Sequence, residues 1–184
     1  MRRQRIATLL SALVVSALLP LAGSAQQNSD YRGTWVLNRQ ASDDINVAIN
    51  RAIAPMNVLV RQIARPRLRS TNTAYPRITI AFDNNNIRVD MQGRPSVSSP
   101  ASGAPVLWQR ETGRTCTQVR GDCIRVTSEW ENGKLEQTFQ ADDGRRVNLY
   151  SLSADGRTLT MNVTITSEKL ERPLTYKLVY NRGS

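Results

Sequence analysis

The sequence predicts a mainly β fold, an antiparallel up-and-down β-barrel of about eight to ten strands with a short helix pair between the first and second strands. Short segments with apolar residues at every second position predict the strands. Turn residues between these segments predict short connections, which favour antiparallel neighbours. Such a meander removes its exposed edges by closing on itself, and a two-sheet sandwich is the alternative.

The N-terminus has the pattern of a cleavable signal peptide over residues 1–25. Three arginines precede an apolar stretch over residues 6–21, and small residues follow. The apolar run is interrupted and shorter than the roughly 20 residues that span a bilayer, so a membrane anchor is the less favoured interpretation. No cysteine follows the run to accept a lipid. We therefore expect a periplasmic or secreted protein whose residues 26–184 form a single domain.

Residues 42–65 have a helical rather than a two-residue period and are predicted to form the helix pair. Ser42 is expected to cap the first helix and Pro55 to end it. The second helix is expected to end before Pro66. The pair either packs against the barrel or covers a cavity as a lid.

The strands are predicted from the alternation of apolar residues and from the turns between them. Asn132-Gly133 is the strongest hairpin signal, because both residues accept the positive φ of a type I′ turn. Asp143-Gly144 and Asp155-Gly156 mark two further turns. The predicted strands lie near residues 35–37, 78–82, 87–91, 106–110, 124–130, 135–139, 146–152, 158–166 and 174–180.

Cys116 and Cys123 are predicted to form a disulfide. Residues an odd number of positions apart on one strand face opposite ways, so a bridge requires the chain to turn back between them. The expected export to an oxidising compartment favours this pairing over free thiols or a metal pair.

The absence of histidine from the whole chain excludes Ser-His-Asp and Cys-His catalysis and the usual imidazole metal sites. No other catalytic group of residues stands out. We therefore expect a binding protein, without a cofactor or a metal, rather than an enzyme.

The formal net charge is +10, and removal of the three signal arginines would leave +7. Such a charge favours anionic partners, including a membrane surface. Aromatic residues are not interleaved among the cations, which argues against specific nucleic-acid binding. One arginine cluster at the end of the predicted second helix is either a solvated face or a site for anionic lipids; its members are Arg61, Arg65, Arg67 and Arg69.

A family resemblance enters at Gly33-Thr34-Trp35. A Gly-x-Trp at the start of the first strand resembles the calycin superfamily, and the helix pair before a run of hairpins is similar to its fatty-acid-binding proteins. The chain also resembles uncharacterised exported bacterial lipocalin-like proteins. The resemblance implies a monomeric barrel with a hydrophobic ligand inside, closed at one end by Trp35 and Arg182. The family's Arg-x-Tyr on the last strand is absent, because Leu178 precedes Tyr180 by two residues.

Alternation places a set of large and polar side chains on the inner face of the expected barrel. Arg110 is either an anchor for an anion or a rim residue whose guanidinium stays in water. Ser128, Arg146 and Asn148 lie on the same faces. The predicted ligand-binding residues are Trp108, Arg110, Trp130, Gln137, Tyr150 and Tyr176.

Together these observations predict an exported protein that binds a hydrophobic or amphipathic small molecule in a β-barrel under a helical lid. The alternative is a non-catalytic envelope protein that binds anionic surfaces or a partner through its basic surface. A cavity below about 300 Å³ would argue against the first function.

Overall fold

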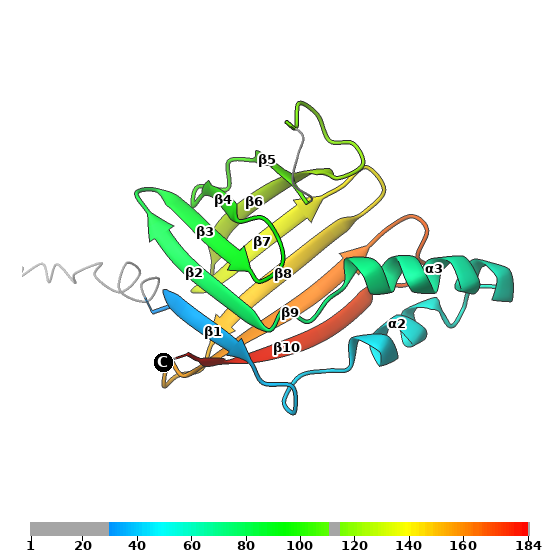
Figure 1. The fold of residues 1–184 in the computed structure, drawn as a ribbon, viewed down its shortest axis with the longest axis horizontal. Coiled ribbons are helices and arrows are strands. Elements are labelled where there is room, and N and C mark those ends of the chain that lie inside the picture. The colour runs from blue at the N-terminus through cyan, green and yellow to red at the C-terminus, as the bar shows by residue number, and fades with distance from the viewer. Residues whose placement is uncertain (1–29, 111–114, 184) are drawn as a thin grey trace, which may run out of the picture.

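The computed structural model describes residues 30–110 and 115–183, so the expected signal peptide, residues 1–25, lies outside the described residues. Ten antiparallel strands form one curved sheet, and two helices connect the first strand to the second (Figure 1). The expected fold class is confirmed. The elements are β1 (Gly33–Leu37), α2 (Ile45–Ile53), α3 (Val58–Thr71), β2 (Arg77–Asp83), β3 (Asn86–Met91), β4 (Val97–Pro100), β5 (Val106–Gln109), β6 (Cys123–Glu131), β7 (Lys134–Gln140), β8 (Arg145–Leu152), β9 (Thr158–Thr166) and β10 (Leu174–Arg182).

The sheet curls into a nearly closed barrel. The strand order is β4-β3-β2-β1-β10-β9-β8-β7-β6-β5. Neighbouring strands in this sheet are therefore consecutive in the sequence, except β1 and β10, which join the beginning of the described domain to its end. The two ends of the sheet approach each other beyond β4, where Gly103 N donates to Ser128 O at 3.2 Å and Ser102 bridges Glu129. The Ser99 and Ser128 hydroxyls also meet at 2.6 Å across this seam.

The tight turns form where the sequence predicts them. Asn132 (φ 50°) and Gly133 (φ 74°) connect β6 to β7, which begin their pairing at Glu131 and Lys134. The positive φ at both positions is what a two-residue type I′ hairpin requires.

One end of the barrel is filled by large aromatic residues. Trp35 is fully buried and its Nε1 donates to Tyr31 O at 3.0 Å. The Tyr31 ring packs edge-on against Trp130 with centroids 5.1 Å apart, and its hydroxyl donates to Gly133 O at 2.9 Å. Burial of these rings closes this end without leaving room for a ligand. The core around them includes Leu135, Tyr150, Leu159, Met161 and Tyr180, none of which is exposed.

The helices lie at the opposite end of the barrel (Figure 1). α2 buries Ala48, Ile49, Ala52 and Ile53 on one face, as a helical period requires. Its N-cap is Asp44, whose carboxylate accepts from Asn46 N at 2.7 Å, rather than the expected Ser42. Ser42 instead accepts from Val179 N at 2.9 Å and so holds the connection to β10. None of the helices in the described part of the chain is long and apolar enough to cross a bilayer.

The prediction that Pro66 ends the second helix is wrong, because α3 continues to Thr71. Proline removes the N–H that would pair with the carbonyl four residues earlier, here that of Gln62. Both positions are exposed, so water can satisfy this carbonyl and the helix tolerates the proline.

Candidate ligand-binding site

A cavity of about 740 Å³ opens at the helix end of the barrel. This volume falls within the roughly 300–1,000 Å³ of small-molecule sites. Its walls are mainly apolar, which suits a ligand with a hydrophobic part. From the helical region and the strands, the apolar lining residues are Met56, Val60, Ile63, Ala64, Leu68, Met91, Trp108, Ile124, Phe139 and Ile165.

Helix α3 contributes its apolar stripe to this cavity without burying it. Val60, Ile63 and Leu68 line the hollow, yet no residue of α3 is buried and 65% of Ile63 is exposed. A surface helix normally gains most of its stability from burying such a stripe. An apolar molecule in the cavity would cover it.

A row of buried polar side chains crosses the interior at the bottom of the cavity. Ser128, Gln137 and Asn148 face each other on β6, β7 and β8, and Ser99 joins the row through its bond to Ser128. Gln137 Nε2 donates to Ser128 Oγ at 3.3 Å. On the far side of this row lie buried core side chains that are not part of the cavity lining, such as Trp35, Leu135 and Leu159, so a ligand in the cavity would occupy the helix half.

Arg146 on β8 brings a positive charge into the cavity wall. Its Nε donates to Asn148 Oδ1 at 2.8 Å and its Nη1 to Asn72 Oδ1 at 3.4 Å. Nη2 is buried and makes no hydrogen bond to the described residues. The ion pairs within the described ranges do not include Arg146, so no carboxylate there balances its charge.

Tyrosine side chains are the other titratable groups around Arg146. Burial lowers the pKa of the guanidinium, but interactions with Tyr176, Tyr75, Tyr150 and Tyr180 outweigh it and raise the pKa above its ordinary value. Burial also raises the pKa of Tyr150, Tyr176 and Tyr180, which keeps these phenols neutral. The titratable groups that act on the pKa of Arg146 are thus phenols, although other charged side chains, including Arg67, Arg145, Asp142 and Asp143, also line the cavity. A guanidinium without a carboxylate partner favours a bound anion.

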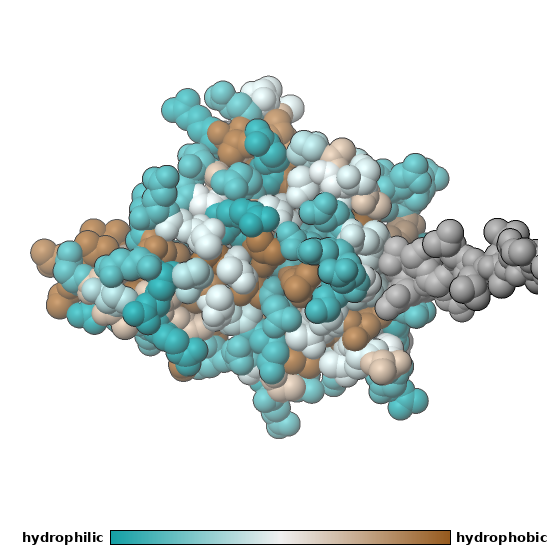
Figure 2. All heavy atoms as spheres, turned by 180° about the vertical axis from the view of Figure 1, so that it is seen from behind, coloured by the Kyte–Doolittle hydropathy of each residue, from teal (hydrophilic) through white to brown (hydrophobic). Residues whose placement is uncertain are grey.

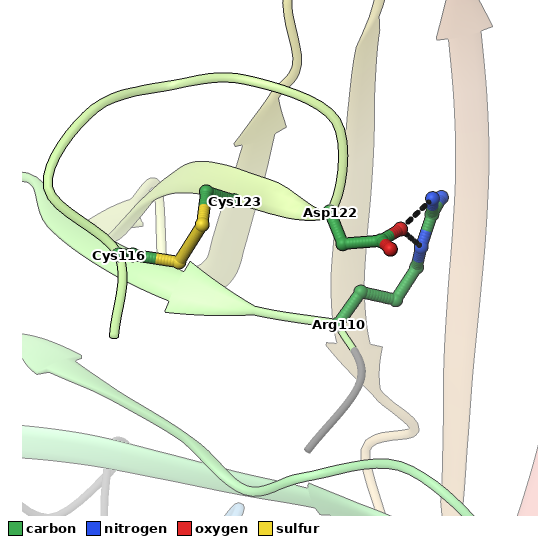
Figure 3. The surroundings of a disulfide bond; sticks show 4 residues. All are labelled: Arg110, Cys116, Asp122 and Cys123. Atoms are coloured by element: carbon green, nitrogen blue, oxygen red, sulfur yellow. Dashed lines mark hydrogen bonds and ion pairs between the residues drawn. A yellow bond between two sulfur atoms is a disulfide. The ribbon is translucent and has the colours of Figure 1, made fainter. Parts of the chain in front are cut away.

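A disulfide-linked loop contributes Gly121 and Asp122 to the cavity lining, and Figure 3 shows its bridge. The expected bridge between Cys116 and Cys123 is present, with Cα atoms 5.5 Å apart. Next to it, Arg110 Nε donates to Asp122 Oδ1 at 3.2 Å, and Nη2 contacts the same oxygen. Both residues line the cavity. Arg110 is ion-paired with Asp122, and its part in ligand binding stays a prediction.

The structure separates the six predicted ligand-binding residues into three groups. Only Trp108 and Arg110 line the cavity. Gln137 and Tyr150 are buried at and below the polar row, and the Tyr176 hydroxyl donates to Asn72 in the wall. Trp130 packs in the filled end of the barrel. Whether any of them binds a ligand stays a prediction.

Sequence reasoning identified the inward face of Arg146 and Asn148 but missed Asn72. Alternation with Tyr150 on one strand was the signal for the first two. Asn72 lies 74 positions from Arg146, directly after a helix. At such a position the periodicity of the sequence does not indicate which way the side chain points. Its contact with the guanidinium depends entirely on the tertiary fold.

No protein-family model and no curated protein matches the sequence. Solved structures do resemble the fold. The secretory abundant heat soluble protein of Ramazzottius varieornatus aligns with a TM-score of 0.54 at 9% identity, over 84% of this chain and 96% of that one. Secretory abundant heat soluble protein 4 of the same organism aligns with a TM-score of 0.50 at 11% identity, over 85% and 96%. Fatty-acid-binding protein 1 of Echinococcus granulosus aligns with a TM-score of 0.49 at 11% identity, over 85% and 99%.

These similarities and the strand order define the class of protein. The chain is an up-and-down β-barrel of ten antiparallel strands with two helices between the first and second strands, and this fold resembles that of the secretory abundant heat soluble proteins. At such low identities the likeness concerns the fold, and the function has to be argued from the cavity.

Proposed function

We propose that the protein is an exported carrier that holds an amphipathic molecule with one anionic group in its barrel. The observation that carries this proposal is the state of Arg146. It lines a mainly apolar cavity of about 740 Å³ and has no ion pair with a described carboxylate. Arg146 is half-buried with its Nη2 fully buried, and leaving such a cation unpaired is costly, a cost that an anionic ligand removes.

The geometry also gives the ligand an orientation. Arg146 lies near the polar row, whereas the apolar stripe of α3 lies at the open end. An amphipathic anion would place its charged group inward and its hydrophobic part against Val60, Ile63 and Leu68. This orientation satisfies the guanidinium and buries the helix stripe at the same time.

Binding of dodecanoate and of dodecan-1-ol, which share a chain and differ in charge, tests the carrier function. The purified protein should bind dodecanoate more tightly by calorimetry or by displacement of a neutral fluorescent probe. Arg146→Met should weaken dodecanoate about 10- to 100-fold, since a charge-assisted hydrogen bond contributes about 1.5–3 kcal/mol. Dodecan-1-ol affinity should change little.

Arg125→Met is the matched control. It removes the same charge from the exposed outer face of β6 and should leave both affinities unchanged. An equal loss of dodecanoate affinity in the Arg125→Met and Arg146→Met variants would show that the effect comes from the net charge of the protein rather than from Arg146. Absence of binding of either probe to the wild-type protein would rule out this carrier function.

The export part of the proposal rests on the sequence of residues 1–25. N-terminal sequencing of protein from its own host should begin at Gln26. A mature protein that retains Met1 would contradict export by this signal.

A second candidate function is binding to an anionic lipid surface. Val47, Val58 and Leu59 are 53%, 59% and 74% exposed, and hydrophobic side chains gather at this end of the molecule (Figure 2). Residues 45–82 contain six arginines and no aspartate or glutamate. Exposed apolar residues beside a segment rich in arginine fit a bilayer with anionic headgroups.

Co-sedimentation with phosphatidylglycerol and phosphatidylcholine vesicles tests the second function. The protein should bind only the anionic vesicles, and the double substitution Val58→Ser and Leu59→Ser should weaken this binding. Leu107→Ser changes an exposed apolar residue on β5 and is the control. Native mass spectrometry separates the two functions, because a small molecule that repeatedly co-purifies supports the carrier.

A further inference from the structure

Asn72 is the first residue after α3, and its buried side chain connects the helix to the guanidinium of Arg146. Oδ1 accepts from Tyr176 OH at 3.0 Å and from Arg146 Nη1 at 3.4 Å. Nδ2 donates to Leu68 O, in the last turn of α3, at 2.9 Å. A guanidinium has only donors and a carbonyl only accepts, so this network fixes which end of the amide faces Arg146.

The acceptors that hold Arg146 are neutral. Asn72 and Asn148 supply amide oxygens to Nη1 and Nε. A carboxylate of nearly the same shape at either position would form an ion pair and cancel the charge. The amides orient the guanidinium and leave its charge available to a ligand.

We propose that Asn72 is a positioning residue that sets the charge preference of the cavity, holding Arg146 in place without neutralising it. This inference rests on the proposed carrier function and deepens it. It predicts that the cavity selects a monoanionic amphiphile because its only built-in partners for the guanidinium, among the residues described, are uncharged.

The substitution Asn72→Asp tests this charge preference with almost no change in shape. At pH 7.5 the variant should lose at least tenfold in dodecanoate affinity, because an internal carboxylate occupies the guanidinium. Its affinity for dodecan-1-ol should stay within about threefold of wild type, which also shows that the cavity is intact. Asn162→Asp, the same change on the exposed outer face of β9, should alter neither affinity.

The Tm of the ligand-free protein distinguishes an interaction between residue 72 and Arg146 from a general structural effect of the substitution. Asn72→Asp loses the Nδ2 bond to Leu68 O in either background. In the wild-type background the introduced carboxylate would face a guanidinium, which offsets part of this loss. In an Arg146→Met background the same carboxylate would be buried without a cation, so Tm should fall further there. Equal Tm changes in both backgrounds would overturn the inference.

The binding results separate the inference from the proposed function. A wild-type protein that prefers dodecanoate, with an Asn72→Asp variant that binds it equally well, would overturn the role of Asn72 alone. A wild-type protein that binds neither amphiphile would overturn both.

Discussion

The guanidinium of Arg182 lies over the indole ring of Trp35, with 4.3 Å between the guanidinium carbon and the ring centroid. The two residues are direct cross-strand partners on β10 and β1. Arg182 also donates to the carbonyls of Gly156, Arg32 and Asp30 at 2.9, 3.0 and 2.6 Å. One side chain thus links the last strand, the first strand and the β8–β9 turn at the filled end of the barrel.

Arg182→Ala should therefore destabilise the protein by about 1–2 kcal/mol, from the lost cation–π contact and hydrogen bonds. Denaturant unfolding measures this loss. Arg182→Lys should restore only part of the stability, because lysine lacks the planar fork. Arg157→Ala removes an exposed charge nearby and is the control. An equal loss of unfolding free energy in this variant would show that the contacts of Arg182 do not account for the effect.

The disulfide should stabilise the fold even though it closes a short loop. Replacing both cysteines, Cys116→Ala with Cys123→Ala, should lower the free energy of unfolding by about 2 kcal/mol, as expected for a loop of this size. The guanidinium chloride midpoint measures this change. Wild-type protein under a strong reductant should unfold at the same midpoint as the double variant, and a midpoint unchanged from oxidised wild type in both would contradict the prediction.

Tyr180 should be a source of instability rather than stability. Its hydroxyl is buried and has no hydrogen-bond partner among the residues described. Tyr180→Phe should raise stability by about 1 kcal/mol, which is a Tm increase of about 2–4 °C in a domain of this size. Tyr176→Phe should have the opposite effect, because that hydroxyl bonds to Asn72. Similar effects of the two changes would show that the Tyr180 hydroxyl is satisfied.

The buried tyrosines should make the fold sensitive to alkali. Burial raises the pKa of Tyr150, Tyr176 and Tyr180. These phenols are neutral in both states below about pH 10, the pKa of tyrosine in an unfolded chain, so they do not change stability with pH there. Above that pH only the unfolded chain ionises readily, and stability falls as pH rises through the folded pKa values. Tyrosinate absorbance should therefore increase together with the loss of near-ultraviolet circular dichroism. Tyr180→Phe should move this transition to higher pH.

Ligand binding should protect α3. Dodecanoate would cover Val60, Ile63 and Leu68, so amide hydrogen exchange over Val58–Thr71 should slow several-fold. The amides of β2, which contributes no residue to the cavity lining, serve as the internal control and should not respond. Exchange in α3 that is indifferent to bound dodecanoate would show that the helix does not contact the ligand.

The barrel could be predicted from the sequence because its signals are local. Alternation placed Trp108, Gln137 and Tyr150 on inner faces, and Asn132-Gly133 specified a hairpin, without reference to distant residues. The resemblance carried by Gly33-Thr34-Trp35 agreed with this topology.

The candidate site was only partly predictable, because charge balance is a tertiary property. Arg110 and Arg146 are equivalent by alternation, yet Asp122 pairs with the first and two amides hold the second. The partner of Arg146 in the helical region is 74 positions away. The end of α3 was wrongly predicted from Pro66, because the free-energy cost of a proline inside a helix depends on whether water reaches the carbonyl that loses its hydrogen bond.

The aromatic residues packed at one end of the barrel affect the route by which a ligand would enter and leave the cavity. Under the proposed carrier function, uptake and release would both take place at the helix end of the barrel, because Trp35, Tyr31 and Trp130 pack in the other end. A partner that delivers the ligand and a partner that receives it would then have to bind at this opening one after the other. A molecule bound over α3 would block both uptake and release.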